Sequence, residues 1–183
     1  MKKSGLLIIG LALIAGSCNN SENKELMKNP LLQEFTTPFE VPPFDRISLT
    51  DFVPATREAI KEHNQEIADI INNSKSPDFL NTIVASEQSG SLLSRVNNVF
   101  SNLNSSLTSE EMQKIAEELS PELSAHSDAI RMNEKLFARI KEVYSAKETL
   151  KLGAEDSMLL EETYTYFVRG GANLSPENKE KLK

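Results

Sequence analysis

Apolar residues recur every three or four positions through most of this chain, the period of a helix that buries one face. No segment alternates apolar and polar residues with the period of two typical of a half-buried strand. The predicted fold class is therefore all-α. We expect five helices, which begin at Thr50 or Asp51, at Asp78 or Phe79, at Thr108, after Asn133 and at about residue 154.

Local signals mark several helix ends. Thr108 and Glu111 have the spacing of a capping box, in which each side chain bonds the other residue's backbone N–H. Asn133 is a favourable N-cap for the fourth helix. Gly170 and Gly171 predict the end of the fifth at residue 169, since glycine adopts the left-handed conformation that closes helices. Ser175 begins a further N-cap pattern near the end of the sequence.

Three features interrupt the helical pattern. Gly90 lies inside the second predicted helix, over about 78–103, and should loosen or bend it. Pro121 lies inside the third, which either kinks there or is two short helices end to end. Residues 29–49 contain four prolines and cannot form a helix, yet they are rich in apolar residues. We expect an extended segment that lies against the helical body.

The first residues have the order of an export signal. Lys2 and Lys3 precede an apolar run over residues 5–14, which is too short to span a membrane, and then three small residues, 15–17. Residues 14–18, Ile-Ala-Gly-Ser-Cys, resemble the bacterial lipobox, whose cysteine carries lipid and becomes the new N-terminus. The resemblance implies lipidation of Cys18, and the alternative is an ordinary signal with a chance cysteine.

This interpretation divides the chain into a signal peptide over 1–17, a flexible tether over 18–28 and a helical domain over 29–183. It predicts a bacterial lipoprotein held at a membrane outside the cytoplasm. Removal of the signal takes two lysines from the 20 basic residues and leaves 27 acidic ones, a formal charge of −9. Nucleic acid is not an expected partner, because phosphate binding needs a basic surface.

A series of short blocks, in order along the chain, resembles the N-terminal region of the thimet oligopeptidase and peptidyl-dipeptidase family of zinc metallopeptidases. Nearly all of residues 29–183 take part in the resemblance. The blocks that carry it are Asn29–Leu32, Pro43–Ile47, Phe52–Ala55, Glu62–Ile67, Asn81–Ala85 with Glu87, Gly90–Asn98, Ser120–Asp128, Leu136–Ile140 and Phe167–Ser175.

In that family, the N-terminal region is a set of helices that forms one wall of a deep substrate channel. The family's zinc is held by an H-E-x-x-H helix and a later glutamate, both in the second half of a much longer chain. The resemblance therefore implies an oligopeptide substrate and a zinc cofactor for a complete enzyme, and a non-catalytic helical role for these residues.

The residues present do not supply that zinc site. His63 and His126 are the two histidines of the chain, and neither has a second histidine one helical turn away. We expect each to lie on a helix face and bond a backbone or carboxylate group, with Asp128 near His126; the less favoured alternative is that the two meet in space beside a carboxylate. No catalytic or metal-binding residue is assigned. Tyr164, Tyr166 and Phe167 either line a peptide channel or form core.

Two hypotheses follow. The first is the N-terminal, non-catalytic portion of a lipid-anchored zinc peptidase, truncated at its C-terminal end, because residues 177–183 are too few for a further helix. The second is a complete helical lipoprotein that binds peptide or protein without catalysis. Whether the gene product is an enzyme stays open, and the chain alone should be inactive under both.

Overall fold

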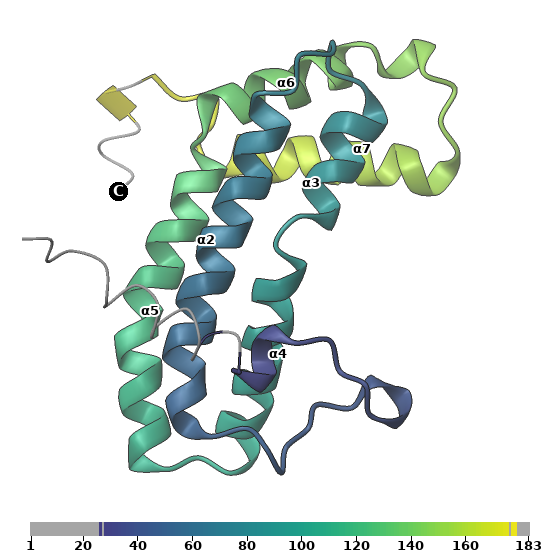
Figure 1. The fold of residues 1–183 in the computed structure, drawn as a ribbon. Coiled ribbons are helices and arrows are strands. Elements are labelled where there is room, and N and C mark those ends of the chain that lie inside the picture. Colours follow the sequence, from purple (N-terminus) through teal and green to yellow (C-terminus); the bar gives the residue numbers. More distant parts are fainter. Residues whose placement is uncertain (1–25, 27, 176, 179–183) are drawn as a thin grey trace, which may run out of the picture.

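The computed structural model describes residues 26, 28–175, 177 and 178 (Figure 1). Over these residues the chain forms helices and no β-strand, which confirms the predicted all-α fold. The α-helices are α2 (Phe52–Ile71), α3 (Ala85–Gln88), α4 (Ser91–Ser106), α5 (Glu110–Arg131), α6 (Glu134–Ser145) and α7 (Ala154–Arg169). Single turns of other helix types are η1 (Pro30–Leu32), η2 (Pro38–Glu40), η3 (Leu49–Asp51), η4 (Phe79–Val84) and η5 (Lys147–Thr149).

The predicted signal peptide, Cys18 and most of the predicted tether lie outside the described residues, so they stay predictions. So does most of the segment after Ser175. Of the helices that the structure describes, none combines the length and the apolar content that crossing a membrane requires.

Two of the predicted helix ends are confirmed. The Asn133 side chain accepts hydrogen bonds from the backbone N–H groups of Lys135 and Leu136, at 3.1 and 3.0 Å. At the end of α7, Gly171 has a φ of 90°, and the backbone of the next residue bonds back to Phe167 in a Schellman closure. These side-chain and glycine signals act within one turn, which is why they can be found in the sequence.

The capping box predicted from Thr108 to Glu111 is wrong by one residue. The N-cap of α5 is Ser109, which has extended backbone angles and whose hydroxyl accepts from the Met112 N–H at 3.2 Å. The Thr108 hydroxyl instead donates to the Asn104 side chain at 3.0 Å. Adjacent hydroxyl residues offer two caps, and the backbone conformation selects between them.

The second predicted helix is not continuous. It divides into the π-helical turn η4, the short helix α3 and the longer helix α4, with the break at Ser89 and Gly90. Gly90 precedes α4 with a φ of 71°, a conformation that residues with a side chain rarely adopt. The glycine therefore breaks the helix, where the sequence predicted that it would loosen or bend it.

Pro121 does not divide α5. The helix runs unbroken from Glu110 to Arg131 with the proline inside it. Proline cannot donate to the carbonyl four residues earlier, which is that of Glu117, and Glu117 and Pro121 are both exposed. Solvent can therefore bond the carbonyl that the proline leaves free.

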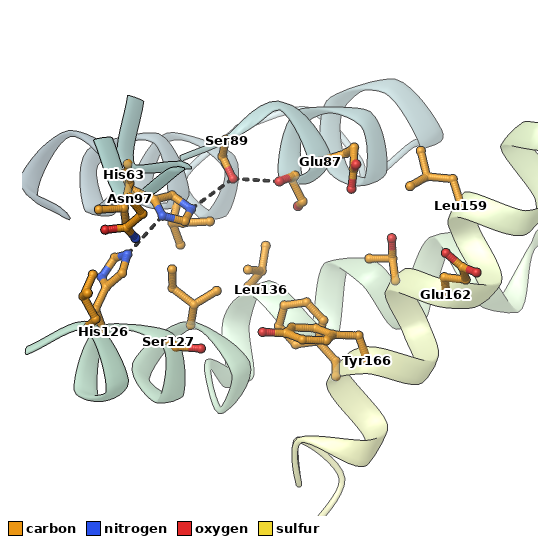
Figure 2. Close-up of a pocket in the computed structure, with 17 residues that line it drawn as sticks. His63, Glu87, Ser89, Asn97, His126, Ser127, Leu136, Leu159, Glu162 and Tyr166 are labelled. Atoms are coloured by element: carbon orange, nitrogen blue, oxygen red, sulfur yellow. Dashed lines mark hydrogen bonds between the residues drawn. The ribbon is translucent and has the colours of Figure 1, made fainter. Parts of the chain in front are cut away.

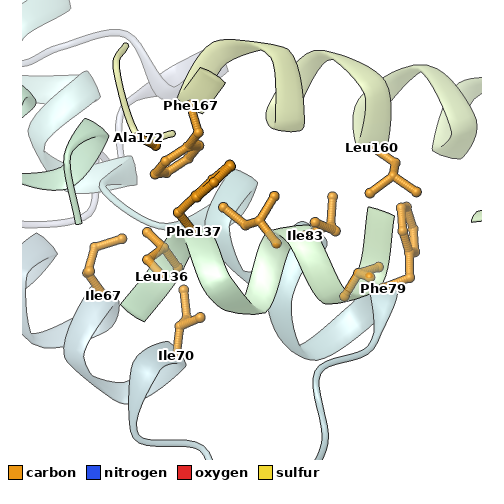
Figure 3. Close-up of a cluster of buried hydrophobic side chains, with 11 residues drawn as sticks. Ile67, Ile70, Phe79, Ile83, Leu136, Phe137, Leu160, Phe167 and Ala172 are labelled. Carbon is orange, nitrogen blue, oxygen red and sulfur yellow. The ribbon is translucent and has the colours of Figure 1, made fainter. Parts of the chain in front are cut away.

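Two hydrophobic clusters hold the helices together, and α2 contributes to both. The α2/α4 cluster comprises Leu31, Phe52, Ala55, Ala59, Leu93, Val96 and Val99. The α6/α7 cluster, drawn in Figure 3, comprises Ile67, Ile70, Phe79, Ile83, Leu136, Phe137, Ile140, Val143, Leu160, Phe167 and Ala172. The break at Gly90 separates η4 and α3, which pack on the second cluster, from α4, which packs on the first.

The proline-rich segment before α2 packs against the helices on both sides of an exposed tip. Leu31 is fully buried, and Arg95 of α4 donates to its carbonyl oxygen at 3.2 Å. Phe39, by contrast, is 98% exposed and has a φ of 59°. The expected contact with the helical body is therefore made by residues such as Leu31, Phe35 and Ile47, while the tip around Phe39 projects into solvent (Figure 1).

Candidate functional site

A cavity of about 610 Å³ lies where the two hydrophobic clusters meet. On α2, His63 stands between Ala59 of the α2/α4 cluster and Ile67 of the α6/α7 cluster. On α5, His126 stands between Leu123 and Ile130, which pack on the same two clusters. Both histidines line the cavity, and helices α3, α4, α6 and α7 complete its walls (Figure 2).

The two histidines contact each other. His126 Nε2 and His63 Nδ1 are 3.0 Å apart, and the rings meet edge to face with their centroids separated by 4.9 Å. The expectation that each would bond a backbone or carboxylate group, with Asp128 beside His126, is wrong. The less favoured alternative, that the two histidines meet in space, is correct for the rings, because α2 and α5 lie side by side over this length (Figure 1). The carboxylate expected beside them in that alternative does not lie between the rings.

The hydrogen bonds form a chain with one consistent direction. The Ser89 hydroxyl donates to the Ser86 carbonyl at 2.7 Å, so its oxygen is free to accept from His63 Nε2 at 3.2 Å. With its proton on Nε2, His63 accepts at Nδ1 from His126 Nε2. This assignment leaves His126 Nδ1 as an acceptor, and that atom is buried with no hydrogen-bond partner among the described residues.

Both imidazoles are held in their neutral forms. Burial lowers the pKa of His63 below 6.5, an effect that the nearby Glu66 carboxylate partly opposes. Burial also lowers the pKa of His126, and a charge on His63 would lower it further. At neutral pH the pair is therefore an uncharged hydrogen-bonded wall of the cavity.

Gly90 packs against the face of the His63 ring. A Cβ atom at Gly90 would lie 2.6 Å from His63 Cε1 and 2.7 Å from Nδ1, well inside contact distance. The Gly90 N–H donates to Glu66 Oε2 at 2.7 Å. The helix break thus brings a backbone without a side chain against the imidazole, which is a close approach that only glycine permits.

Ser89 and His63 do not form a nucleophilic site. The Ser89 hydroxyl proton points to a carbonyl oxygen and not to the imidazole that would remove it. The following N–H, of Gly90, would have to stabilise an oxyanion but already donates to the Glu66 carboxylate. A negative charge developing there would be repelled, so this geometry does not support acyl transfer.

The donor set does not fit zinc either. A zinc site needs three or four nitrogen, sulfur or oxygen ligands converging on one point. In the described part of the chain, no three His, Cys, Asp or Glu side chains gather closely enough to hold a metal ion. The two histidines aim Nδ1 and Nε2 at each other across a hydrogen bond, and no chemical step through a metal is derived for these residues.

The other end of the cavity carries two carboxylates. Glu87 of α3 and Glu162 of α7 line it there, beside Leu159, at the opposite end from the histidine pair (Figure 2). Both glutamates are exposed at the mouth. The aromatic residues of α7 take both predicted roles. Tyr164 packs partly buried on the α6/α7 cluster, Phe167 is buried in that cluster and also lines the cavity, and Tyr166 is 48% exposed and lines the cavity.

The sequence contained few signals for this site. Helical periodicity placed His63 and His126 on helix faces. It could not predict how the two helices align against each other, because the two histidines lie sixty-three residues apart in the sequence. Ser89 and Glu162 belong to no motif, and Glu87 belongs only to the blocks that carry the family resemblance; none of the three was predicted to be a site residue. Gly90, a glycine inside a helical pattern, was the local sequence feature that pointed to the region where the cavity forms.

Comparison with known proteins shows that the chain is similar to bacterial peptidases. No family model matches it. The chain is 41% identical over 155 residues to dipeptidyl carboxypeptidase of Salmonella typhimurium strain LT2 and to that of Escherichia coli strain K12. It is 24% identical over the same length to oligopeptidase A of Escherichia coli strain K12.

These matches cover 85% of this chain but only 23% of dipeptidyl carboxypeptidase and 22% of oligopeptidase A. The chain therefore spans less than a quarter of the length of the curated relatives that it matches. The resemblance indicated by the sequence blocks is confirmed: over most of its length this chain is related to a part of dipeptidyl carboxypeptidase and, more distantly, to a part of oligopeptidase A.

Proposed function

We propose that these residues form a non-catalytic helical portion of a peptidase that acts on oligopeptides. Two observations together carry this proposal. The chain is 41% identical to dipeptidyl carboxypeptidase over 155 residues, and the side chains that the structure describes do not fit a zinc site. We infer that such a segment contributes by positioning a substrate, because its described residues include no group arranged to attack a peptide bond.

The cavity at the cluster junction supports that role. Its walls come from six helices, so it is a rigid feature of the fold and not a loop conformation. Its histidine end is neutral, and its floor is apolar with side chains such as Leu136 and Phe167. Such a surface suits the side chains of an extended peptide better than a folded partner.

Zinc belongs to this proposal only for a longer product. The ligands would be supplied by residues beyond this region, as the family resemblance implies, and not by His63 or His126. Calorimetric titration of the purified chain with Zn²⁺ tests this directly, with His126→Gln as the control. We expect no stoichiometric binding; a one-to-one site lost in the variant would contradict the assignment.

We further propose that the protein is held at a membrane outside the cytoplasm by lipid on Cys18. The support is the order of residues 1–18, which combines a basic start, an apolar run and a small-residue segment before the cysteine. Several acyl chains on one residue anchor stably, whereas one chain binds marginally. A peptidase held in this way would act on peptides outside the cytoplasm.

The alternative is a helical lipoprotein that binds peptide without catalysis. The α2/α4 and α6/α7 clusters favour it, because each buries apolar side chains from several segments of this chain. The coding sequence in the intact gene separates the two. An H-E-x-x-H motif downstream in the same reading frame supports the peptidase, and a stop codon after Lys183 supports the binding protein.

A further inference from the structure

We propose that the cavity between the histidine pair and Glu87 binds a peptide segment that carries a cationic side chain next to apolar ones. This inference rests on the proposed function, since it names the class of peptide that the helical region selects. The cation would lie toward Glu87 and Glu162, and the apolar neighbours along the floor.

The volume and the floor suit a short piece of chain. About 610 Å³ lies within the range of roughly 300–1,000 Å³ found for small-ligand sites. It is too small for a folded element and large enough for a few side chains. The floor is formed by apolar groups from five helices, Ile67, Leu93, Ile130, Leu136 and Phe167.

The charge of the cavity lining has one sign. Glu87 and Glu162 are its ionised groups, and no lysine or arginine lines it. Within the described residues neither glutamate side chain has a hydrogen-bond or ion-pair partner, although both stand beside apolar groups. The histidines at the far end carry no charge at neutral pH. A ligand with a positive charge at the carboxylate end would therefore complement the charge of the lining.

The two glutamates are not equivalent. Glu162 also borders an adjoining depression with Arg131 and Arg169, and the Arg131 guanidinium lies 5.3 Å from the centre of the Tyr166 ring. Those arginines partly offset the field of Glu162. Glu87 does not border that depression, so it should carry the larger share of the selectivity.

Calorimetric titration with two blocked peptides tests the proposal. The probes are acetyl-Ala-Leu-Lys-Leu-Ala-amide and the same peptide with Gln in place of Lys, so that one side-chain charge separates them. We expect the Lys peptide to bind more tightly than the Gln peptide, with a preference that falls as salt is raised. Solvent-exposed charge pairs of this kind are worth about two- to five-fold in affinity each.

Matched variants locate the effect. Glu87→Gln should weaken the Lys peptide by about two- to five-fold and leave the Gln peptide unchanged. Glu162→Gln should do the same to a smaller degree. Glu155→Gln is the control, because Glu155 is exposed on the same helix as Glu162 and does not line the cavity. Neither cavity variant alters a buried side chain, so all three proteins should fold.

Three results would overturn the proposal. The first is equal affinity for both peptides, and the second is a preference that Glu87→Gln does not reduce. The third is binding to this chain that a longer natural product lacks, which would assign the cavity to a contact with other residues of that product. None of these results would touch the proposed peptidase role, which is measured by peptide hydrolysis in the complete product.

Discussion

Gly90→Ala should destabilise the protein through the histidine at the cluster junction. The new Cβ would stand 2.6 Å from His63 Cε1, closer than any real Cβ contact. The His63 ring must therefore move, and it cannot do so without loosening its bonds to Ser89 and His126, at 3.2 and 3.0 Å. This substitution thus tests whether the helix break at Gly90 and the histidine pair are energetically coupled.

The magnitude has two parts. A φ of 71° costs a residue with a side chain about 1–2 kcal/mol, partly offset by the roughly 0.4–1 kcal/mol gained as the unfolded chain loses freedom. Each of the two hydrogen bonds is worth about 0.5–1.5 kcal/mol net. We expect a loss of about 2–3 kcal/mol, or about 5–10 °C in Tm for a chain of this size.

Urea denaturation followed by circular dichroism measures the loss, with Gly153→Ala as the control. Gly153 has an ordinary φ of −66°, and a Cβ there would meet no atom within 4 Å. The weaker N-cap and the stiffer unfolded chain should nearly cancel, to within about 0.5 kcal/mol. A double-mutant cycle then separates the clash from the backbone strain.

In a His63→Ala background, Gly90→Ala should cost only the backbone part, about 1 kcal/mol, which gives a coupling energy of about 1–2 kcal/mol. The reasoning is refuted if Gly90→Ala and Gly153→Ala have the same effect. It is also refuted if the cost of Gly90→Ala does not change when His63 is removed, since strain of the backbone alone would then account for all of it.

Four further predictions test other parts of the account. Because the pKa values of His63 and His126 are lowered in the folded protein, the unfolded chain takes up protons first as pH falls. The free energy of unfolding should therefore decrease as pH drops through about 6.5 and then level off, as measured by urea titrations between pH 8 and 5. The decrease should be smaller in His126→Gln. Leu160→Ala should cost about 2–5 kcal/mol, since Leu160 is 1% exposed, while Met158→Ala on the same helix, 60% exposed, should stay within about 0.5 kcal/mol in the same assay. Asn133→Ala should cost about 1 kcal/mol in urea denaturation through the loss of the α6 cap, and a change below about 0.3 kcal/mol would contradict the capping role. Cys18→Ser should abolish incorporation of labelled fatty acid in a bacterial host, and labelling that persists in the variant would place the lipid elsewhere.

Local physics explains why the helices could be predicted. An amphipathic period, an N-cap such as Asn133 and a terminating glycine such as Gly171 each act within a turn or two, so the sequence holds them in full. The choice of Thr108 in place of Ser109 as the N-cap of α5 is an error of one residue within such a local signal. Both hydroxyls can cap, and the choice depends on backbone angles that the residue types do not determine.

The site could not be predicted in the same way. The His63–His126 contact depends on the register of α2 against α5, which many small packing terms set together. Glu87 and Glu162 come from α3 and α7, two helices far apart in the sequence that both pack on the α6/α7 cluster. Gly90 was the partial exception, since a glycine inside a helical pattern marks an irregularity without saying what approaches it.

The most direct test of the central claim is a hydrolysis assay of the natural product. The polypeptide that carries this sequence is purified from its host membranes with antibodies raised against the purified chain, and release of C-terminal dipeptides from blocked oligopeptides is measured with and without chelator. We predict that the activity purifies with a product longer than 183 residues, is lost with chelator and returns with Zn²⁺. A product that carries this sequence, binds peptide and hydrolyses none would contradict the peptidase assignment.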